Sequence, residues 1–322
     1  MNAKHGDGAA LGARLRRRDL AAAASVLNLL ESRVPDSREQ ATALLAAVSP
    51  ASLGEEAPGH IVGITGPPGV GKSSLLSMLI REWRSRDRSV AVLAVDPTSR
   101  RSGGALLGDR ARIDVDPGDR GLFIRSTAAG DRLGGLAPAT RAAAAALSAA
   151  FDVVVIETVG VGQSETEVAD VADTVAVVVQ PASGDVLQFL KAGIMEVPDV
   201  LVVTKADLGR IATRAAADLK AALRSLGSAD TAVVAVSALA PGSGIAELAD
   251  ALDEHRAAID LPARRLRARR MHALAEFAAE HGERGLRTLG GRREAEKRLA
   301  GEDPGLDVPA LLRSLERQAG AA

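Results

Sequence analysis

Apolar residues along the chain follow two patterns. Between residues 60 and about 258, short runs of β-favouring apolar residues alternate with longer stretches that have helical spacing. Such continuous runs are typical of strands covered on both faces, so they predict an α/β fold with a largely parallel sheet flanked by helices. The expected strands are Ile61–Thr65, Val90–Val95, Leu122–Arg125, Val153–Ile156, Thr174–Val179, Val200–Val203 and Ala232–Val236.

The two ends of the chain show helical periodicity alone. Residues 1–58 are rich in Ala, Leu and Arg, and from Leu261 onward the strand signals stop. We therefore expect an N-terminal helical extension (1–58), an α/β domain (59–260) and a C-terminal helical arm (261–322). Within the ends, the pattern predicts helices over Asp19–Val34 and Ser37–Val48, a loop over Ser49–Gly59, and helix breaks at Gly290-Gly291 and Pro304-Gly305.

A phosphate-binding loop follows the first expected strand. The pattern G-x-x-x-x-G-K-[ST] is matched at every fixed position by Gly66, Pro67, Pro68, Gly69, Val70, Gly71, Lys72 and Ser73. The following helix is expected over Lys72–Arg86, and Ser74 in its first turn is a further candidate for nucleotide binding. Glycines let backbone N–H groups approach phosphate oxygens, and the helix N-terminus adds its positive dipole end. Lys72 is expected to reach the terminal phosphates and Ser73 to bind Mg²⁺. The motif predicts a P-loop NTPase.

The composition of the chain excludes several classes of protein and of binding partner. The 40 basic and 41 acidic residues nearly cancel and aromatic residues make up 2% of the chain, which argues against nucleic acid as a partner. No Cys is present, which excludes disulfides and thiolate metal sites. The longest uncharged runs fall well short of the ~18 apolar residues that a membrane span needs. We expect a soluble cytoplasmic protein, with the Arg-rich segments at residues 14–18 and 264–270 as solvated helix faces.

Two acidic residues follow expected strands at the edge where α/β sheets bind ligands. Asp96 comes directly after Val90–Val95, before a glycine-containing loop that includes Asp109. Glu157 ends a Walker B strand, and the loop after it carries Gly160, whose N–H is placed to sense the γ-phosphate. Carboxylates at these positions suit Mg²⁺ or its waters. We therefore expect Lys72, Asp96 and Glu157 to carry the phosphate chemistry.

The base specificity is predicted by the segment after the strand Val200–Val203. Thr204, Lys205 and Asp207 resemble the guanine motif N-K-x-D, in which the Asp accepts hydrogen bonds from two guanine donors that adenine lacks. Thr204 replaces the usual Asn, which removes one amide from the network that tethers the loops. Ser237 and Ala238 resemble the last guanine-contacting loop. The ligand is therefore expected to be GTP or GDP.

Together these motifs resemble the MeaB/ArgK family, the G-protein chaperones of adenosylcobalamin-dependent methylmalonyl-CoA mutase and related acyl-CoA mutases. The resemblance rests most of all on Glu-Thr-Val-Gly-Val-Gly-Gln-Ser-Glu at 157–165. It is supported by Val-Asp-Pro at 95–97, Gly-Gly-x-Leu-Leu-Gly-Asp at 103–109, Leu-Gly-Gly-Leu at 133–136 and Gly-Asp-x-Leu-Gln at 184–188. The chain departs from the family at Thr204, Ala105, Arg110 and Ala111.

The resemblance implies a SIMIBI-class G domain and a homodimer made by the C-terminal arm. Apolar positions such as Leu266, Met271, Leu274 and Phe277, in a segment that we expect to be too short to bury a core alone, fit such an arm. It also implies that the protein gates cofactor loading and protects or reactivates the mutase. It places Ser73, Asp96, Asp109 and Glu157 around Mg²⁺, and Gln188 and Lys191 in a loop that communicates with the mutase.

Hydrolysis without the partner is expected to be slow. Val161 lies where Ras-like proteins carry a water-orienting Gln, and whether Gln163 takes that role stays open. Two alternatives also stay open, a metal-delivery GTPase and an ATP-dependent kinase or transport ATPase. The absence of Cys and the scattered histidines, which we expect to be solvated or capping residues, argue against the first. Asp207 argues against the second.

Overall fold

The computed structural model describes residues 7–32, 34–96, 113–116, 118–128, 136–158, 167–181, 198–239 and 242–320. The chain divides into two compact units. Unit 1 comprises residues 1–58, 145–150 and 260–322, and unit 2 comprises residues 59–144 and 151–259. The two helical ends of the chain therefore fall in the same unit.

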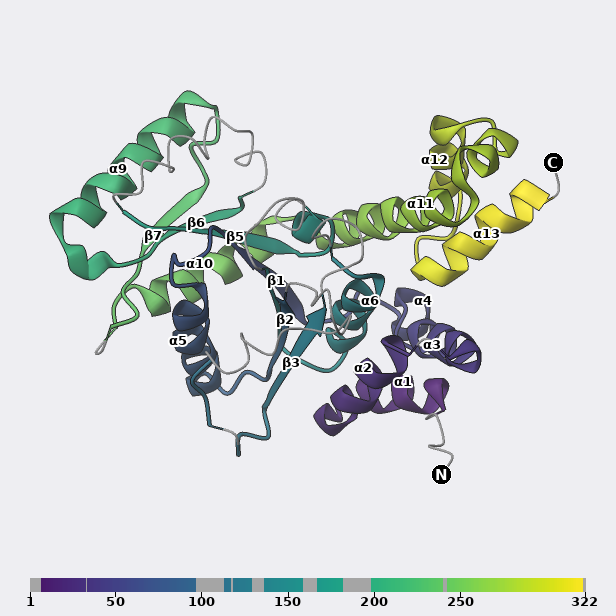
Figure 1. Cartoon of the computed structure of the whole chain (residues 1–322), viewed down its shortest axis with the longest axis horizontal. Helices are drawn as coiled ribbons and strands as arrows, with labels where there is room; N and C mark the ends of the chain where they lie inside the picture. Colours follow the sequence, from purple (N-terminus) through teal and green to yellow (C-terminus); the bar gives the residue numbers. More distant parts are fainter. Residues whose placement is uncertain are drawn as a thin grey trace, which may run out of the picture. The chain divides into compact units, whose positions relative to one another are not determined.

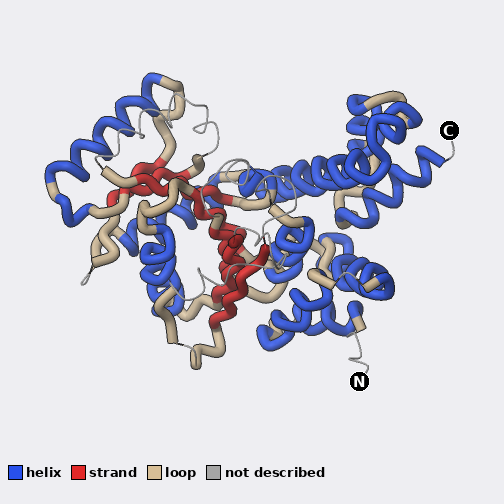
Figure 2. Tube along the Cα trace, viewed as in Figure 1, coloured by secondary structure: helices blue, strands red, loops and turns tan. Residues whose placement is uncertain are grey.

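Unit 2 is built on one sheet, in which the described residues form seven parallel strands (Figures 1 and 2). Their order across the sheet is β3-β2-β4-β1-β5-β6-β7. All seven strands predicted from the apolar runs are confirmed, and β3 continues beyond its expected end to Ala128. Their bounds are β1 His60–Thr65, β2 Val90–Asp96, β3 Leu122–Ala128, β4 Val153–Glu157, β5 Thr174–Val179, β6 Val200–Val203 and β7 Ala232–Ala235.

The helices of this region are α5 (Lys72–Ser85), α6 (Pro138–Leu147), α9 (Arg210–Ser225) and α10 (Ile245–Ala258), with short 3-10 turns at Val168–Asp170 and Ala206–Leu208. The apolar faces of α5 and α10 pack with one face of the sheet into a single core, and the two helices lie side by side (Figure 1). Trp83 of α5 is 1% exposed in this core.

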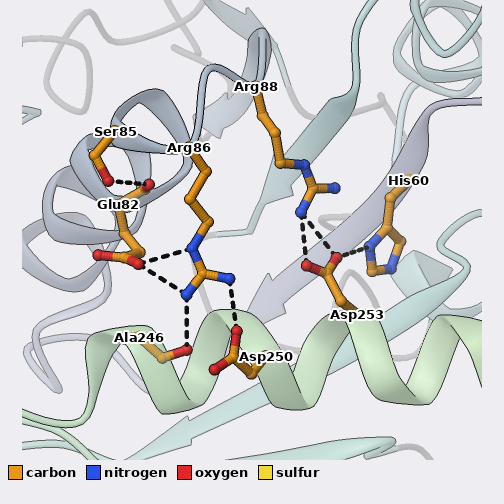
Figure 3. A network of polar contacts seen from close by, with 8 residues as sticks. All are labelled: His60, Glu82, Ser85, Arg86, Arg88, Ala246, Asp250 and Asp253. Carbon is orange, nitrogen blue, oxygen red and sulfur yellow. Dashed lines mark hydrogen bonds and ion pairs between the residues drawn. The ribbon is translucent and has the colours of Figure 1, made fainter.

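Polar contacts tie the end of α5 to α10 (Figure 3). The Arg86 guanidinium donates to Glu82 within α5 at 2.8 Å and to Asp250 of α10 at 2.6 Å. Arg88 donates to both carboxylate oxygens of Asp253, at 2.9 and 2.7 Å. Burial alone would raise the pKa of Asp253, but the hydrogen bonds from His60 and Arg88 outweigh it and hold the pKa below its usual value of 3.8.

A chain of polar groups continues from His60 along the edge of the sheet where β1, β5 and β6 begin. The His60 ring contacts Asp253 through Nδ1 at 3.6 Å and the Thr174 hydroxyl through Nε2 at 2.8 Å. The same hydroxyl lies 2.9 Å from Nδ1 of His255, whose Nε2 is 3.1 Å from Asp199. His60 is 1% exposed. The expectation that this histidine is solvated is therefore wrong.

Unit 1 contains helices from both ends of the chain. The predicted helix over Asp19–Val34 is a 3-10 turn at Leu20–Ala22 followed by a helix that ends at Leu30, and the predicted loop over Ser49–Gly59 contains the short helix α4. Ser49 caps α4 by accepting a hydrogen bond from Ser52 N–H, which explains a helix in a Pro- and Gly-containing stretch. The helices are α1 Gly8–Arg16, α2 Ala23–Leu30, α3 Pro35–Ala47, α4 Pro50–Leu53, α11 Leu261–Thr288, α12 Arg292–Ala300 and α13 Val308–Gly320.

The C-terminal helices bury apolar residues against one another. Leu274 and Phe277 of α11 are 1% and 0% exposed, in a cluster that takes its other buried members from the rest of α11, the segment to α12, α12 and α13. The expectation that this segment is too short to bury a core alone was wrong, because a helix break at 289–291 and a second at 301–307 let three helices fold back on one another. Of the apolar positions predicted for an interface, Met271 stays 48% exposed.

The Arg-rich segment of α11 is bound within unit 1 rather than solvated, which corrects the sequence-based expectation. Arg265 is 8% exposed and donates to the Ala57 carbonyl oxygen at 2.6 Å. Arg269 makes a bidentate pair with Glu56, at 2.9 and 2.8 Å. Arg270 donates to the Ala300 carbonyl oxygen at 3.0 Å. These arginines join α11 to the segments around residues 56 and 300, where carbonyls and carboxylates would otherwise be unpaired.

Candidate nucleotide-binding site

The phosphate-binding loop joins β1 to α5. Its glycines adopt backbone conformations that would be strained for any other residue. Gly66 has a φ of 142°, and a Cβ atom there would lie 2.1 Å from the Val178 carbonyl oxygen. Gly69 and Gly71 have φ values of 77° and 96°, with open space where a Cβ atom would be. Gly71 is the N-cap of α5, so the helix begins at Lys72 and directs its N-terminus at the loop. This geometry suits an anion.

Lys72 lies folded over the loop. The residue is 8% exposed, and Nζ donates to the carbonyl oxygens of Gly66 at 2.7 Å and Pro67 at 3.1 Å. These bonds hold the ammonium group above the loop backbone. A phosphate bound by the loop would therefore lie within reach of a positive charge.

Ser73 and Glu157 converge beside the loop. The Ser73 hydroxyl donates to Oε1 of Glu157 at 3.1 Å. Glu157 ends β4 between β1 and β2 and is 3% exposed. A hydroxyl and a carboxylate are hard oxygen donors, so this pair fits Mg²⁺. Asp96 ends the neighbouring strand β2, where the structure describes its backbone alone.

The segment after β6 presents a carboxylate beside the loop after β7. Asp207 is exposed, and its Oδ1 accepts a hydrogen bond from the Ser237 hydroxyl at 2.7 Å. The Ala206 N–H donates to the Val236 carbonyl oxygen at 2.9 Å, which ties the two segments together along the backbone. Lys205 adopts a left-handed conformation with a φ of 56°, and its ammonium group contacts the side-chain oxygen of Gln180. Ser237 thus engages one oxygen of Asp207, and the exposed residue is accessible to a base.

Thr204 connects this segment to the phosphate-binding loop. It is 5% exposed, and its hydroxyl lies 2.8 Å from the Val70 carbonyl oxygen and 3.1 Å from that of Val179. The sequence comparison with N-K-x-D indicated a lost tether at this position. The Thr204 hydroxyl instead supplies a tether, because it bonds directly to the backbone of the phosphate-binding loop.

Ser237 is fixed from both sides of its loop. Its N–H donates to the Ser243 carbonyl oxygen at 3.0 Å, and Ser243 N–H donates back to Ser237 at 3.1 Å. Its hydroxyl also accepts from Leu239 N–H at 3.2 Å. Ala238 lies between these bonds and is half-buried. The loop therefore holds the hydroxyl that positions Asp207.

Two sets of contacts, one buried and one part-buried, carry no motif that sequence reasoning could use. The hydroxyls of Thr65 and Thr158 lie 2.8 Å apart and link the ends of β1 and β4. Glu167 accepts from Leu136 N–H at 2.8 Å and from Arg141 at 2.6 Å. The sequence could have indicated these contacts in one way alone, by a polar residue at the point where an apolar element begins or ends.

Several predicted site residues lie outside the described residues. They are Asp109, Gly160, Gln163, Gln188 and Lys191, together with Val161. Among the helices that the structure describes, none combines the length and apolar character that a bilayer crossing requires.

Comparison with known proteins identifies a family. A family model described as "Methylmalonyl Co-A mutase-associated GTPase MeaB" matches residues 7–286. A "Probable GTPase" of Mycobacterium tuberculosis is 42% identical over 268 residues, which cover 80% of this chain and 77% of that protein. A Caenorhabditis elegans protein named "Methylmalonic aciduria type A homolog, mitochondrial" is 43% identical over 195 residues, or 58% of this chain and 49% of that protein.

A solved structure is similar over nearly the whole chain. It is described as "Crystal structure of LAO/AO transport system kinase", with a TM-score of 0.66, 28% sequence identity, and coverage of 98% of both chains. Its similarity supports the fold and the order of elements around the site described above.

Proposed function

Because this chain belongs to the MeaB family of methylmalonyl-CoA mutase-associated GTPases, we propose that it serves an adenosylcobalamin-dependent acyl-CoA mutase through its nucleotide state. In this proposal the GTP-bound and GDP-bound forms bind the mutase differently, and the protein gates cofactor loading and protects or reactivates the enzyme. A switch of this kind needs a difference in partner affinity between its two states. The name of the Caenorhabditis elegans relative supports the same class of partner.

The observation that carries the guanine assignment is the hydrogen bond between Ser237 and Asp207. This bond orients the Asp207 carboxylate. The two carboxylate oxygens would accept hydrogen bonds from guanine N1–H and N2–H₂. Thr204 then connects the base-reading segment to the phosphate-binding loop through the Val70 carbonyl oxygen. The two halves of a guanine nucleotide would therefore be bound by segments that position each other.

Phosphate chemistry is assigned to the groups around the loop. Lys72 binds the β- and γ-phosphate oxygens and offsets charge that develops on them. Ser73 and Glu157 would hold Mg²⁺, with Asp96 and Asp109 as further candidates, and that ion supplies charge neutralisation between the phosphates when bound. Gln163, Gln188 and Lys191 are the proposed contacts through which the mutase senses the nucleotide.

The central experiment is GTP turnover with and without the mutase of the same cell. We expect slow turnover by the protein alone and faster turnover once the mutase is added. Lys72→Ala should abolish turnover in both conditions, whereas Lys220→Ala, an exposed lysine of α9, should leave it unchanged. Equal turnover with and without every candidate mutase, and no complex with a GTP analogue, would remove the mutase proposal and leave the GTPase.

Competition between ATP and GTP for the site distinguishes the proposed GTPase from an ATP-dependent kinase. The similar solved structure carries the name of a transport-system kinase, and such a protein would use ATP. Here the Asp207 carboxylate favours GTP, because adenine offers no donor pair to it. Excess ATP should leave a fluorescent GTP analogue bound, and excess GTP should displace it. Displacement by both nucleotides at equal concentration would support the kinase.

We also propose that the protein is a homodimer formed through its C-terminal helices, as the family resemblance implies. Since Leu274 and Phe277 are buried within the chain, the contact would use the outer surface of these helices, including the exposed Met271.

A further inference from the structure

Three ionisable side chains converge within unit 1, whereas the nucleotide-binding residues belong to unit 2. Glu280 and His281 belong to α11 and Glu316 to α13, and one ligand atom from each lies within 4.8 Å of the others. His281 Nε2 lies 3.6 Å from Glu316 Oε1. The sequence gives no hint of this group, because 35 positions separate His281 from Glu316 in the chain.

The distances suit a tetrahedral transition-metal ion. Zn²⁺ binds nitrogen and oxygen ligands at about 2.0–2.2 Å, so two ligands of one ion lie roughly 3.4 Å apart. The His281–Glu316 distance is already close to that separation. The ligand atom of Glu280 lies within 4.8 Å of both, and a change of glutamate rotamer can bring it closer. Glu280 and Glu316 side chains are 44% and 36% exposed, so they have room to rotate.

The imidazole is held in position by the core beneath it. The ring of Phe277, which is 0% exposed, lies one helical turn before His281, with the two ring centroids 4.6 Å apart. Gly282 follows with a φ of 62° and interrupts α11 directly after the histidine. Helices α11 and α13 pack through Phe277, Leu311 and Leu315, so the two sides of the group come from elements with a fixed separation.

The chemistry of the group selects the class of ion. One imidazole with two carboxylates suits borderline ions such as Zn²⁺ and Co²⁺, whereas Mg²⁺ and Ca²⁺ prefer oxygen ligands alone. Two carboxylates also match the charge of a divalent cation. The Arg38 guanidinium donates to Oε2 of Glu280 at 3.2 Å.

We propose that Glu280, His281 and Glu316 form a binding site for a divalent transition-metal ion of the zinc type, which joins α11 to α13. The site is separate from the proposed Mg²⁺ site at Ser73 and Glu157 and does not depend on the proposed function. Because the ligands come from two helices, the ion binds the folded protein and stabilises it against unfolding.

The test is a titration of the full-length protein with Zn²⁺ by calorimetry, and with Co²⁺ by visible absorption. Saturating GDP and Mg²⁺ are present throughout, so that the nucleotide site is filled. The parent should bind one ion with the intense Co²⁺ absorption of a tetrahedral site, and Zn²⁺ should raise its melting temperature. His281→Ala and Glu316→Gln should each weaken binding at least tenfold and remove the shift in melting temperature.

The same helix offers a matched control. His272 and Glu276 form a pair one turn apart, with Nε2 and Oε1 separated by 3.7 Å and no third ligand of a metal cluster among the described residues. His272→Ala should therefore keep the parent's affinity and absorption. Melting curves without metal show whether each variant is folded. If His281→Ala and His272→Ala bind Zn²⁺ as the parent does, or if the parent binds no ion at micromolar concentration, the site does not exist.

Discussion

At the scale of single residues, the most constrained backbone position in the site is Gly66. A Cβ atom there would meet the carbonyl oxygen of Val178, a backbone atom of β5 that cannot rotate away. Gly69 has a positive φ but open space around it. We expect Gly66→Ala to lower GTP affinity at least tenfold, and to destabilise the fold by about 2 kcal/mol or more. Gly69→Ala should cost about 1 kcal/mol, the ordinary strain of a left-handed alanine.

Nucleotide titration and urea unfolding of the two variants check this difference. Equal losses in Gly66→Ala and Gly69→Ala would show that the contact with Val178 does not limit the loop.

Some site residues were predictable because a local motif carries them, and others depend on contacts between distant segments. Lys72 and Ser73 follow from spacing alone, and the structure places Ser73 against Glu157, 84 positions later. The role of Thr204 was not predictable. Its hydroxyl reaches the Val70 carbonyl oxygen across 134 positions, and only the folded loops show that a threonine has the right length there.

At the scale of elements, the strands were predicted well because they are covered on both faces and their apolar runs are continuous. β1, β4, β5 and β6 are buried along their whole length. Helix ends were predicted less well. The helix expected over Asp19–Val34 begins as a 3-10 turn capped by Asp19, and α4 was missed because a four-residue helix has too few positions to show a period.

Buried polar groups at the start of β1 make stability depend on pH. Burial lowers the pKa of His60 below its usual 6.5, against the opposing effect of the hydrogen bond to Asp253. In the pH range below 6.5 the unfolded chain therefore binds more protons than the native protein. The contribution of His60 to the free energy of unfolding is therefore complete above that pH. It is lost as the pH falls, with a slope of at most about 1.4 kcal/mol per pH unit.

Urea unfolding of the parent and His60→Gln between pH 7.5 and 5 measures this effect. The parent should lose stability relative to the variant on acidification. Parallel curves would show that His60 is protonated equally in the folded and unfolded states.

At the scale of the whole molecule, the chain's two ends contribute to one helical unit, so removing the C-terminal helices would also disturb residues 1–58. The dimer is therefore better tested in the full chain. Light scattering should give about twice the 33.0 kDa of one chain at micromolar concentration. Met271→Asp, which places a charge on the exposed apolar position of α11, should shift the mass toward the monomer while GTP binding stays unchanged.

The control for this variant is Leu226→Asp, at a similarly exposed leucine after α9. A parent that is already monomeric, or a loss of dimer in both variants alike, would contradict an interface on the C-terminal helices.

Asp207 is central to the account of the whole molecule, because we propose that it selects guanine for a switch that the mutase reads. The most direct measurement is triphosphate turnover by Asp207→Asn with GTP and with xanthosine triphosphate, each with and without the mutase. Xanthine offers a carbonyl where guanine offers an amino donor, so the asparagine amide should pair with it. We predict that the variant loses turnover of GTP and gains turnover of xanthosine triphosphate, and that the mutase accelerates the latter. Retention of GTP as the preferred substrate would contradict the assignment of the site and of the switch built on it.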